Sequence, residues 1–332
     1  MTERAKVLVI GSNSFSGSDF IDLLMEEDRY HIVGVSRSPE KSALALPYKR
    51  HSNPSYQFVQ IDLNTQMDRL AYLIDSWEPE YVVNFAAQSE VAPSWEHPGD
   101  WFKTNAVAMT ELADILKQRS HLKRYVHISL PEVYGTCVGR VTESAPLNPS
   151  TPYAASKAAG DLSLSTFAKN YGLPLVMIRA TNVYGAHQQL FKIIPRSVIY
   201  LRQGRRIQLH GGGRAVKSYI HIRDVSRGEH AAMLHGRPGE IYHLSPDRGY
   251  SVRSIVENIC LLMGKDFDSC TETVAERLGQ DAAYVIDSTK AREAFGWAPQ
   301  IDLETGLHQV VEWVHRYWTE IESQTLEYVH KA

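Results

Sequence analysis

Short apolar runs recur along the first half of the chain, separated by stretches in which apolar residues repeat at helical spacing. The runs that predict strands are residues 6–10, 30–36, 56–61, 81–86, 124–129 and 174–179. Helical patterns lie between them, for example at 63–77 and 101–118. Regular alternation of strands and helices is typical of a doubly wound parallel sheet, so we predict an α/β fold.

The pattern becomes irregular at about residue 187. Beyond it come a glycine-rich segment at 211–214, short strand patterns at 206–210 and 282–287, and helical patterns at 251–264, 289–295 and 303–323. We therefore predict two domains, residues 1–186 and residues 187–332, of which the second is a smaller α/β unit. A strand pattern at 240–245 is expected to rejoin the sheet of the first domain.

A glycine turn joins the first predicted strand to the first predicted helix. The segment Gly11-Ser-Asn-Ser-Phe-Ser-Gly17 follows the apolar run and precedes the helical pattern at 18–27. This is the context in which a dinucleotide binds, because helix N-terminal amides hold its pyrophosphate and glycines let the backbone approach it. Ser14 stands where the middle glycine of such turns is usual. An ordinary turn between a strand and a helix is the alternative interpretation.

A tyrosine and a lysine open another helical stretch, residues 153–170, which is rich in Ala and Leu and contains no Pro. Tyr153 and Lys157 are four residues apart and share a helix face. A neighbouring ammonium favours the phenolate form of a tyrosine, so the pair could take a proton from a substrate hydroxyl while a hydride leaves the same carbon. Chance spacing is the alternative, since the chain has 17 tyrosines.

Further motifs follow in a fixed order over nearly the whole chain. They are Gly11…Gly17, Asp62-Leu63, NFAAQSEV at 84–91, SLPEVYG at 129–135, PYAASK at 152–157, RATNVYG at 179–185 and RLGQDAAYVID at 277–287. In these motifs the chain resembles the extended short-chain dehydrogenases/reductases that act on nucleotide sugars, in particular the dTDP-glucose and GDP-mannose 4,6-dehydratases. The resemblance implies a Rossmann fold, a nicotinamide cofactor that is regenerated in each cycle, and a nucleotide-diphosphate-sugar substrate.

The resemblance also implies which residues bind the cofactor. They are Gly11, Asn13, Ser14, Phe15, Gly17, Ser36, Arg37, Asp62, Leu63, Ala86, Ala87, Gln88, Asn105, Tyr153 and Lys157. In the family, the Asp-Leu pair contacts the adenine, the two alanines line the cofactor, and the Asn supports the catalytic lysine. For each position taken alone, structural packing is the alternative.

The family's substrate-binding positions match Ser89, Asn182, Lys192, Lys217 and Arg277. The serine faces the sugar, and the others hold the nucleotide or its diphosphate. Lys217 replaces the usual arginine and would bind phosphate as a point charge, without the bidentate fork. As isolated residues, such cations are more often surface charges.

The end of the second strand bears on the choice of cofactor. An acidic residue about 20 positions after the glycine turn normally binds the ribose 2′-hydroxyl of NAD. Here the strand ends in Ser36, Arg37 and Ser38, without a carboxylate. An arginine flanked by hydroxyls would bind a 2′-phosphate through charge-assisted hydrogen bonds. We therefore favour NADP over NAD; a solvent-exposed Arg37 with NAD bound is the alternative.

The segment 129–134 departs from the family pattern, in which a Thr bonds the C4 oxygen, an Asp protonates the departing C6 hydroxyl and a Glu takes the C5 proton. Glu132 is kept, but Leu130 replaces the Thr and Pro131 replaces the Asp. Ser129 is a possible substitute for the Thr hydroxyl. These departures affect the elimination step more than the oxidation step.

Composition excludes several classes of function. A net charge of −3 gives no general field for nucleic acid or membrane, and no apolar run approaches 18 residues. The three cysteines have no CxxC spacing, and no metal site is expected. An N-terminus that enters the first strand at once leaves no room for a signal peptide, so we expect a cytoplasmic protein.

These observations predict an NADP- or NAD-dependent nucleotide-sugar 4,6-dehydratase-like enzyme with Tyr153, Lys157 and Glu132 as catalytic residues. It would oxidise C4, abstract the C5 hydrogen and eliminate water from C6. A C4- or C5-epimerase that uses the same Tyr/Lys pair is the first alternative, and a non-catalytic dinucleotide sensor is the second. Family resemblance further implies a homodimer formed through the helices near 101–118 and 153–171.

Overall fold

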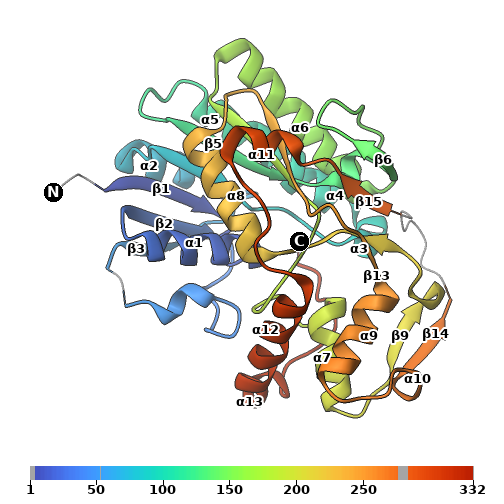
Figure 1. Cartoon of the computed structure of the whole chain (residues 1–332). Helices are drawn as coiled ribbons and strands as arrows, with labels where there is room; N and C mark the ends of the chain where they lie inside the picture. Colours follow the sequence, from blue (N-terminus) through green and yellow to red (C-terminus); the bar gives the residue numbers. More distant parts are fainter. Residues whose placement is uncertain (1–3, 53, 276–282, 332) are drawn as a thin grey trace.

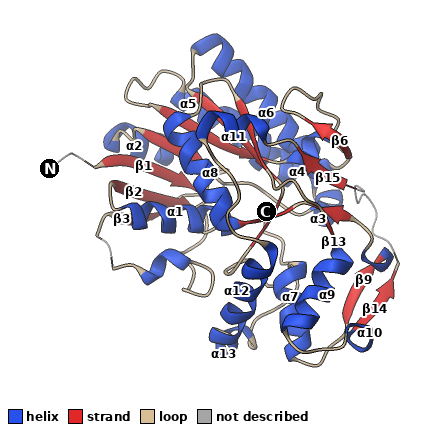
Figure 2. Cartoon of the chain, in the orientation of Figure 1, coloured by secondary structure: helices blue, strands red, loops and turns tan. Residues whose placement is uncertain are grey.

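The computed structural model describes residues 4–52, 54–275 and 283–331. A seven-stranded parallel sheet forms the centre of its larger part (Figure 1, Figure 2). In sheet order the strands are β12 (Ile241–Leu244), β7 (Leu175–Ala180), β5 (Arg124–Ser129), β4 (Tyr81–Asn84), β1 (Ala5–Ile10), β2 (Tyr30–Ser36) and β3 (Tyr56–Gln60). Neighbouring strands are parallel throughout, and the chain order reverses between β1 and β4. The predicted α/β fold with a doubly wound sheet is confirmed.

Helices cover both faces of this sheet (Figure 2). One face carries α1 (Phe15–Glu27), α8 (Ile222–His235) and α11 (Thr289–Phe295). The other carries α2 (Met67–Trp77), α5 (Ala108–Leu116) and α6 (Pro152–Tyr171). Val7 and Val9 of β1 pack into the first layer, whereas Leu8 and Ile10 pack into the second. Burial on both faces explains why β1 is an unbroken apolar run rather than an alternating one.

The smaller part has a core of its own, to which Val198, Ile259 and Val310 contribute. Its elements are α7 (Ile193–Arg202), β9 (Ile207–His210), α9 (Val252–Leu262), α10 (Phe267–Cys270), β14 (Thr271–Val274), α12 (Leu303–Arg316) and α13 (Trp318–Ile321). The shorter elements that join the two parts are α3 (Val91–Glu96), α4 (Pro98–Phe102), β6 (Cys137–Val141), β8 (Asn182–Tyr184), β10 (Val216–Lys217), β11 (Tyr219–His221), β13 (Tyr250–Ser251) and β15 (Ala283–Ile286). The boundary at residue 186 stays a prediction.

The continuous helix expected at 101–118 is interrupted in the structure. Between α4 and α5 the backbone forms a π-helical turn, η2 (Lys103–Val107). The main-chain oxygen of Asn105 in this turn lies against α6, where a Cβ at Gly160 would come within 2.2 Å of it. A glycine at that position lets the two helices approach closely, and the widened turn is the kind of local irregularity that often marks a functional site.

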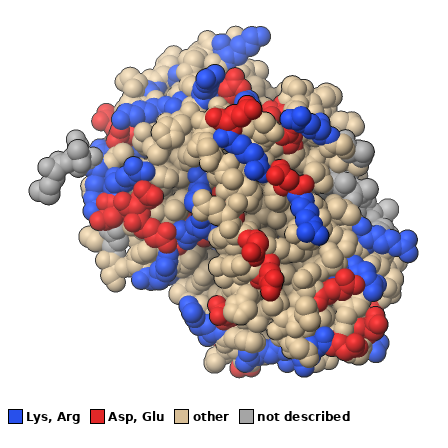
Figure 3. All heavy atoms as spheres, in the orientation of Figure 1, with Lys and Arg blue, Asp and Glu red and all other residues tan. Residues whose placement is uncertain are grey.

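Acidic and basic side chains are interspersed on the face shown in Figure 3. An anionic ligand must therefore be held by local cations rather than by a general field of the protein. Among the described residues, no helix is both long enough and apolar enough to cross a bilayer.

Candidate active site

The turn between β1 and α1 lets a ligand approach the backbone closely. Gly11 has a φ of +85°, and a Cβ there would lie 2.6 Å from the main-chain nitrogen of Ala86. A Cβ at Gly17 would lie 2.5 Å from the carbonyl oxygen of Gly11, so both positions require glycine. Ser14 is the N-cap of α1, and its Oγ accepts the N–H of Gly17 at 3.0 Å. A helix cap thus replaces the expected middle glycine.

The same turn offers polar groups that suit a dinucleotide. The main-chain N–H of Asn13 donates to Ser36 Oγ at 2.9 Å, and its Nδ2 donates to the carbonyls of Ser38 and Pro39 at 2.9 Å. Its Oδ1 is buried and has no hydrogen-bond partner among the described residues. Phe15 begins α1 and is buried. A tight glycine turn, a helix N-terminus and an unpaired buried acceptor fit a bound dinucleotide.

Two cations stand beyond the end of β2. Arg37 directly follows this strand, and its Nη2 donates to Gln88 Oε1 at 3.3 Å. Lys41, which the sequence analysis did not single out, donates from Nζ to the carbonyl of Asn13 at 2.9 Å. Burial lowers the pKa of Lys41. The cations therefore lie beside the glycine turn, at the position where an adenosine ribose binds in this type of fold.

The other predicted cofactor residues follow the neighbouring strands. Asp62 and Leu63 come after β3, where Asp62 Oδ1 accepts the N–H of Asn64 at 2.9 Å and Leu63 is buried. Ala86 and Ala87 come after β4, the first half-buried and the second exposed. Because the strands are parallel, their carboxyl ends meet the glycine turn at one edge of the sheet.

Asn105 bonds to the loop after β4 rather than to the catalytic lysine. Its side chain accepts the N–H of Gln88 at 2.8 Å and donates to the carbonyl of the same residue at 2.9 Å. It also donates to Ser156 Oγ at 2.9 Å. Asn105 therefore ties the loop that carries Gln88 to α6, one residue before Lys157.

Helix α6 begins immediately before the predicted tyrosine. Thr151 is its N-cap and accepts the N–H of Ala154 at 3.1 Å, and Pro152 occupies the first helical position. The main-chain N–H of Tyr153 donates to Ser94 Oγ at 3.2 Å. The capped start fixes where Tyr153 and Lys157 lie on the helix.

Lys157 is held at the carboxyl end of β5. Its ammonium donates to the carbonyl of Ile128 at 2.7 Å and lies 3.5 Å from His127 Nε2. Burial lowers the pKa of Lys157 to about 8, although the charge of Asp161 acts in the opposite direction. Burial, Lys157 and a nearby arginine also lower the pKa of His127 well below its usual value, so this imidazole is neutral.

The expectation that Tyr153 has a lowered pKa is wrong for this structure. Burial raises the pKa of the phenol, and the charges of Glu132 and Glu90 raise it further. The ammonium of Lys157 is directed at the carbonyl of Ile128. The raised pKa favours the protonated phenol at Tyr153.

The segment that departs from the family pattern is apolar where the family is polar. Leu130 and Pro131 are buried, and Leu130 belongs to an apolar cluster against which Tyr153 packs. Glu132 lies in the following 3₁₀ turn, η3 (Pro131–Tyr134), and is half-buried. This turn directly follows β5, whose carboxyl end holds Lys157, and the charge of Glu132 contributes to the raised pKa of Tyr153.

A buried ionic network under α6 was missed by the sequence analysis. Asp161 Oδ2 accepts from Ser129 Oγ at 2.6 Å and from Arg179 Nη2 at 2.7 Å. Arg179 also donates to the hydroxyl of Tyr134, which lies 2.8 Å from His243 Nε2. The Ser129 hydroxyl is therefore bonded to a carboxylate, rather than presented in place of the missing threonine.

Of the predicted substrate residues, two lie close to the loop after β4. Ser89 is half-buried there and precedes Glu90, whose φ of +82° is unusual for a residue with a side chain. Lys192, the N-cap of α7, pairs with Glu90 through Nζ and Oε1 at 2.5 Å. The charge of Lys192 is thus engaged by a carboxylate that also acts on Tyr153.

The remaining substrate residues lie on the short strands between the two parts. Asn182 begins β8 and pairs with Tyr219 of β11. Lys217 is in β10, two residues before Tyr219, so the sheet pairing brings both predicted residues to the same region. Arg277 falls in 276–282 and lies outside the described residues.

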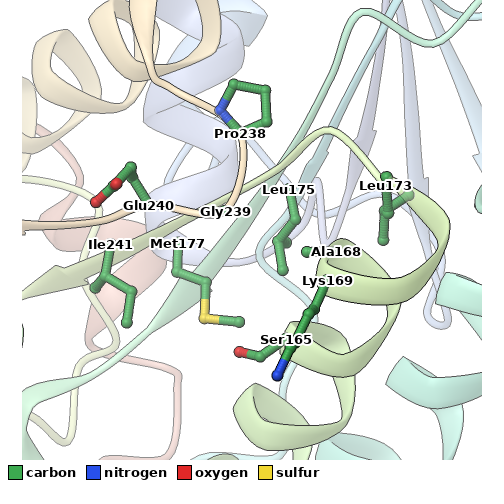
Figure 4. Close-up of a pocket in the computed structure, with 11 residues that line it drawn as sticks. Ser165, Ala168, Lys169, Leu173, Leu175, Met177, Pro238, Gly239, Glu240 and Ile241 are labelled. Atoms are coloured by element: carbon green, nitrogen blue, oxygen red, sulfur yellow. The ribbon is translucent and has the colours of Figure 1, made fainter.

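A separate surface pocket lies at the far end of α6 (Figure 4). It is lined by residues of that helix, β7 and the loop before β12, including Lys169, Leu175 and Ile241. Tyr153 and Lys157 are on the first two turns of α6, whereas the pocket lies at its last turn. The pocket therefore does not belong to the candidate active site.

Comparisons with known proteins agree with this geometry. The family model described as GDP-mannose 4,6 dehydratase matches residues 8–310. A dTDP-glucose 4,6-dehydratase from Streptomyces antibioticus is 32% identical over 327 residues, which cover 95% of this chain and 94% of that protein. The corresponding enzyme from Haemophilus influenzae is 27% identical and covers 92% and 97% of the two chains.

Solved structures of the same class superpose over most of the chain. A dTDP-glucose 4,6-dehydratase from Streptomyces venezuelae with NAD bound has a TM-score of 0.88 and 30% identity, covering 95% of this chain and 98% of that one. A UDP-glucose 4-epimerase from Thermotoga maritima with UDP-glucose has a TM-score of 0.85 and 26% identity, covering 94% and 99%.

These comparisons confirm the predicted resemblance to the nucleotide-sugar dehydratases. They also confirm the predicted class of enzyme, a nicotinamide-dependent dehydratase or epimerase of nucleotide sugars. Since the family model spans most of the chain, the protein belongs to the GDP-mannose 4,6 dehydratase family.

Proposed function

We propose that this chain is a nucleotide-sugar 4,6-dehydratase in which Tyr153, Lys157 and Glu132 carry the chemistry. The observation that supports the proposal is the position of the three residues around the carboxyl end of β5, with Lys157 bonded to the Ile128 carbonyl, Glu132 in the turn after the strand and Tyr153 packed against the cluster that includes Leu130. When bound, the nicotinamide cofactor supplies the acceptor for the C4 hydride and later returns that hydride. Tyr153 first releases its phenolic proton to solvent, which the positive charge of Lys157 favours, and the phenolate then receives the proton of the C4 hydroxyl.

Glu132 takes the C5 proton once C4 is a ketone. A carboxylate is a weak base, with an ordinary pKa of about 4.3, so it acts only on a hydrogen that the ketone has acidified. The departing C6 hydroxyl then needs a proton. Pro131 cannot donate one, whereas Glu132 has just acquired one. We assign both transfers to Glu132, so that the proton leaves C5 and departs with the C6 hydroxyl as water. The returning hydride is added at C6, and C5 takes up a proton from solvent through Glu132.

A C4- or C5-epimerase is the second candidate, favoured by the apolar character of Leu130 and Pro131. A C4-epimerase returns the hydride to C4 and needs no acid for C6. A non-catalytic sensor is the weakest candidate, because it has no need of a tyrosine and a buried lysine four residues apart on α6.

The test is product analysis in D₂O with a panel of nucleotide sugars. A 4,6-dehydratase gives a product that has lost one water and carries deuterium from solvent at C5. The Glu132→Gln variant is expected to lose both outcomes while substrate still reduces the bound cofactor. Turnover without loss of water but with deuterium at C5 indicates a C5-epimerase. Turnover with neither assigns the C4-epimerase reaction.

For the cofactor we propose a preference for NADP, although NAD is bound in the related dehydratase structure. The support is local: Arg37 and Lys41 lie at the end of β2, where NAD-specific folds place a carboxylate. Calorimetric titration with NADPH and NADH measures the preference directly. In Arg37→Ala it is expected to fall by about tenfold, as for one lost charge-assisted contact. Equal affinities in the wild type would reject the preference.

We also propose a homodimer formed through α6 and the neighbouring helices. Four apolar side chains on these elements are exposed: Phe102 (40%), Val107 (52%), Leu162 (59%) and Tyr171 (56%). Exposed apolar groups on packed helices are typical of a subunit interface. Sedimentation of the wild type and of Leu162→Glu tests it, with a monomeric wild type at micromolar concentration as the contrary result. A cytoplasmic location stays a prediction.

A further inference from the structure

The last described segment, residues 325–331, crosses the molecule as a strap, and the end of the chain lies near the centre of the view in Figure 1. The ring of Tyr328 meets that of Phe191 edge-on, with centroids 5.6 Å apart. His330 stacks on Trp101 at 5.2 Å with 7° between the ring planes. Its Nε2 also lies 2.8 Å from Asp100 Oδ2. These contacts fix the strap on α4 and on the segment before α7.

The strap ends against two residues of the cofactor site. The carbonyl of Lys331 accepts from Gln88 Nε2 at 2.5 Å and from Arg37 Nη2 at 3.0 Å. Gln88 is in turn bonded to Asn105, so the strap is connected to the loop after β4 and to the end of β2 at once. The strap thus covers the edge of the sheet at which the adenosine part of a dinucleotide binds.

The side chain of Lys331 brings a third cation to this edge. The side chain starts from the residue whose carbonyl accepts from Arg37 at 3.0 Å, so its ammonium lies within reach of the same edge, and its charge contributes to the lowered pKa of Lys41 after the larger effect of burial. Lys41 is itself fixed by the carbonyl of Asn13. Glu40, the carboxylate closest in sequence, accepts from Tyr48 at 2.9 Å and pairs with Lys49 at 3.0 Å. The carboxylate beside the cations is therefore engaged elsewhere.

Like charges that a fold holds together repel one another unless an anion lies among them. Here Arg37 and Lys41 of the loop after β2 and Lys331 of the strap come from two segments far apart in the chain and meet beside the glycine turn. Charge-assisted contacts from several cations are what a dianionic phosphate monoester requires.

We propose that the strap completes a binding site for the 2′-phosphate of an adenosine cofactor, with Lys331 as a specificity-determining residue. This deepens the proposed function, because it adds a residue outside the glycine turn to the choice between the two nicotinamide cofactors. His330 positions Lys331 through its stacking on Trp101 and its contact with Asp100.

The experiment compares ligands that differ by the 2′-phosphate alone. NADPH and NADH, and 2′,5′-ADP and 5′-AMP, are titrated by calorimetry into the wild type, Lys331→Ala and Lys265→Ala. Lys265 is exposed beyond α9, so its loss is a matched control for net charge. We expect Lys331→Ala to lower the affinity for NADPH and 2′,5′-ADP by about three- to tenfold, as for one partly exposed charge-assisted contact, with less than twofold change for the other two ligands. Lys265→Ala is expected to change none of them.

A second variant separates the charge from its positioning. His330→Ala keeps Lys331 but removes the anchor, so it is expected to lower the same selectivity by a smaller factor. Hydrogen exchange of residues 325–331 supplies a readout that activity does not, and NADPH is expected to slow it more than NADH does. Tighter binding of both cofactors to Lys331→Ala, with faster exchange on adding NADPH, would show that the strap is a competitor and would overturn the proposal. Unchanged selectivity would overturn it equally.

The two proposals fail in distinguishable ways. The wild-type ratio of NADPH to NADH affinity tests the proposed cofactor preference, whereas the change in that ratio on losing Lys331 tests the strap. A wild type without preference, whose ratio still falls in Lys331→Ala, rejects the first and supports the second.

Discussion

Two buried ionic clusters differ in how their charges are balanced. The α6 cluster (His127, Lys157, Asp161, Arg179) includes the proposed catalytic lysine and lies between α6 and the sheet. Its carboxylate faces a guanidinium at 2.7 Å, and the neighbouring ammonium is bonded to a backbone carbonyl at 2.7 Å. Its charges therefore have defined partners and a fixed direction, toward the end of the sheet where the chemistry is expected.

The α1–α8 cluster (Asp19, Asp22, Arg223, Glu229) lies between the helices that cover the opposite face of the sheet. Burial raises the pKa of Asp19, whereas hydrogen bonds from Arg50 and Arg223 outweigh burial and lower the pKa of Asp22. Glu229 has neither carboxyl oxygen bonded within the described residues, and burial with the charge of Asp19 raises its pKa well above the usual value.

The spacing of possible metal-ligating side chains in and beside the α1–α8 cluster does not by itself indicate a function. Asp22, Glu26 and His51 lie close enough together to hold a cation. Arg50 and Arg223 already supply positive charge to the two carboxylates. The comparison teaches that a buried charge matters for catalysis where it fixes a reacting group, and elsewhere it bears mainly on stability.

The largest effect, a loss of turnover, is expected from Tyr153→Phe, because Tyr153 is the residue proposed to take the substrate proton. Removing a general base typically costs about 10²–10⁴-fold in kcat, and the phenyl ring keeps the packing against Leu130. Cofactor affinity should be unchanged in calorimetry. Tyr72→Phe is the control, because Tyr72 is 75% exposed. Unchanged turnover in Tyr153→Phe would remove the residue from the mechanism.

Much of the candidate active site could be predicted from the sequence alone, because its sequence signals are local. The glycine turn, the capped start of α6 and the four-residue spacing of Tyr153 and Lys157 can all be identified within a few residues. Asp161 continues that spacing by four more residues, so it could have been identified as a third group on the same face.

The partners of Asp161 could not be predicted in this way. Arg179 comes from β7 and Ser129 from β5, and only the strand order brings them together under α6. The strap is a similar case. Its residues have no helical or strand periodicity, and its contacts with Arg37 and Gln88 span more than 240 positions of the chain.

The second-largest effect, a loss of stability, is expected from Asp161→Asn, which breaks the buried ion pair with Arg179. Leaving a buried charge without its partner typically costs about 3–5 kcal/mol, to be measured as a lower free energy of unfolding in urea. Asp114→Asn removes a surface pair with Lys117 and should cost about 1 kcal/mol or less. Equal losses of stability in Asp161→Asn and Asp114→Asn would contradict the distinction between the buried ion pair and the surface ion pair.

The third prediction concerns the pH profile of turnover. The pKa of Lys157 is about 8, and the proposed role requires its charged form. The charged fraction falls as pH rises through this value, so kcat should drop about tenfold between pH 7 and pH 9. Since Asp161 raises the pKa of Lys157, the decline in Asp161→Asn should begin at lower pH. A flat profile to pH 9 would show that the charge of Lys157 is not required.

The smallest effect is expected from Glu229→Gln, in the cluster remote from the chemistry. The pKa of Glu229 is raised in the folded protein, so its contribution to stability is fully present below the unfolded pKa of about 4.5 and is lost as pH rises through the folded value. An amide of the same shape does not titrate, and it removes the cost of ionising a buried acid. The variant should therefore match the wild type near pH 4 and be more stable than the wild type at pH 8, in urea unfolding at both pH values. Glu322→Gln, at an exposed position, is the matched control. Turnover should be unchanged, and a variant less stable than the wild type at pH 8 would mean that the Glu229 carboxylate is stabilising where it lies.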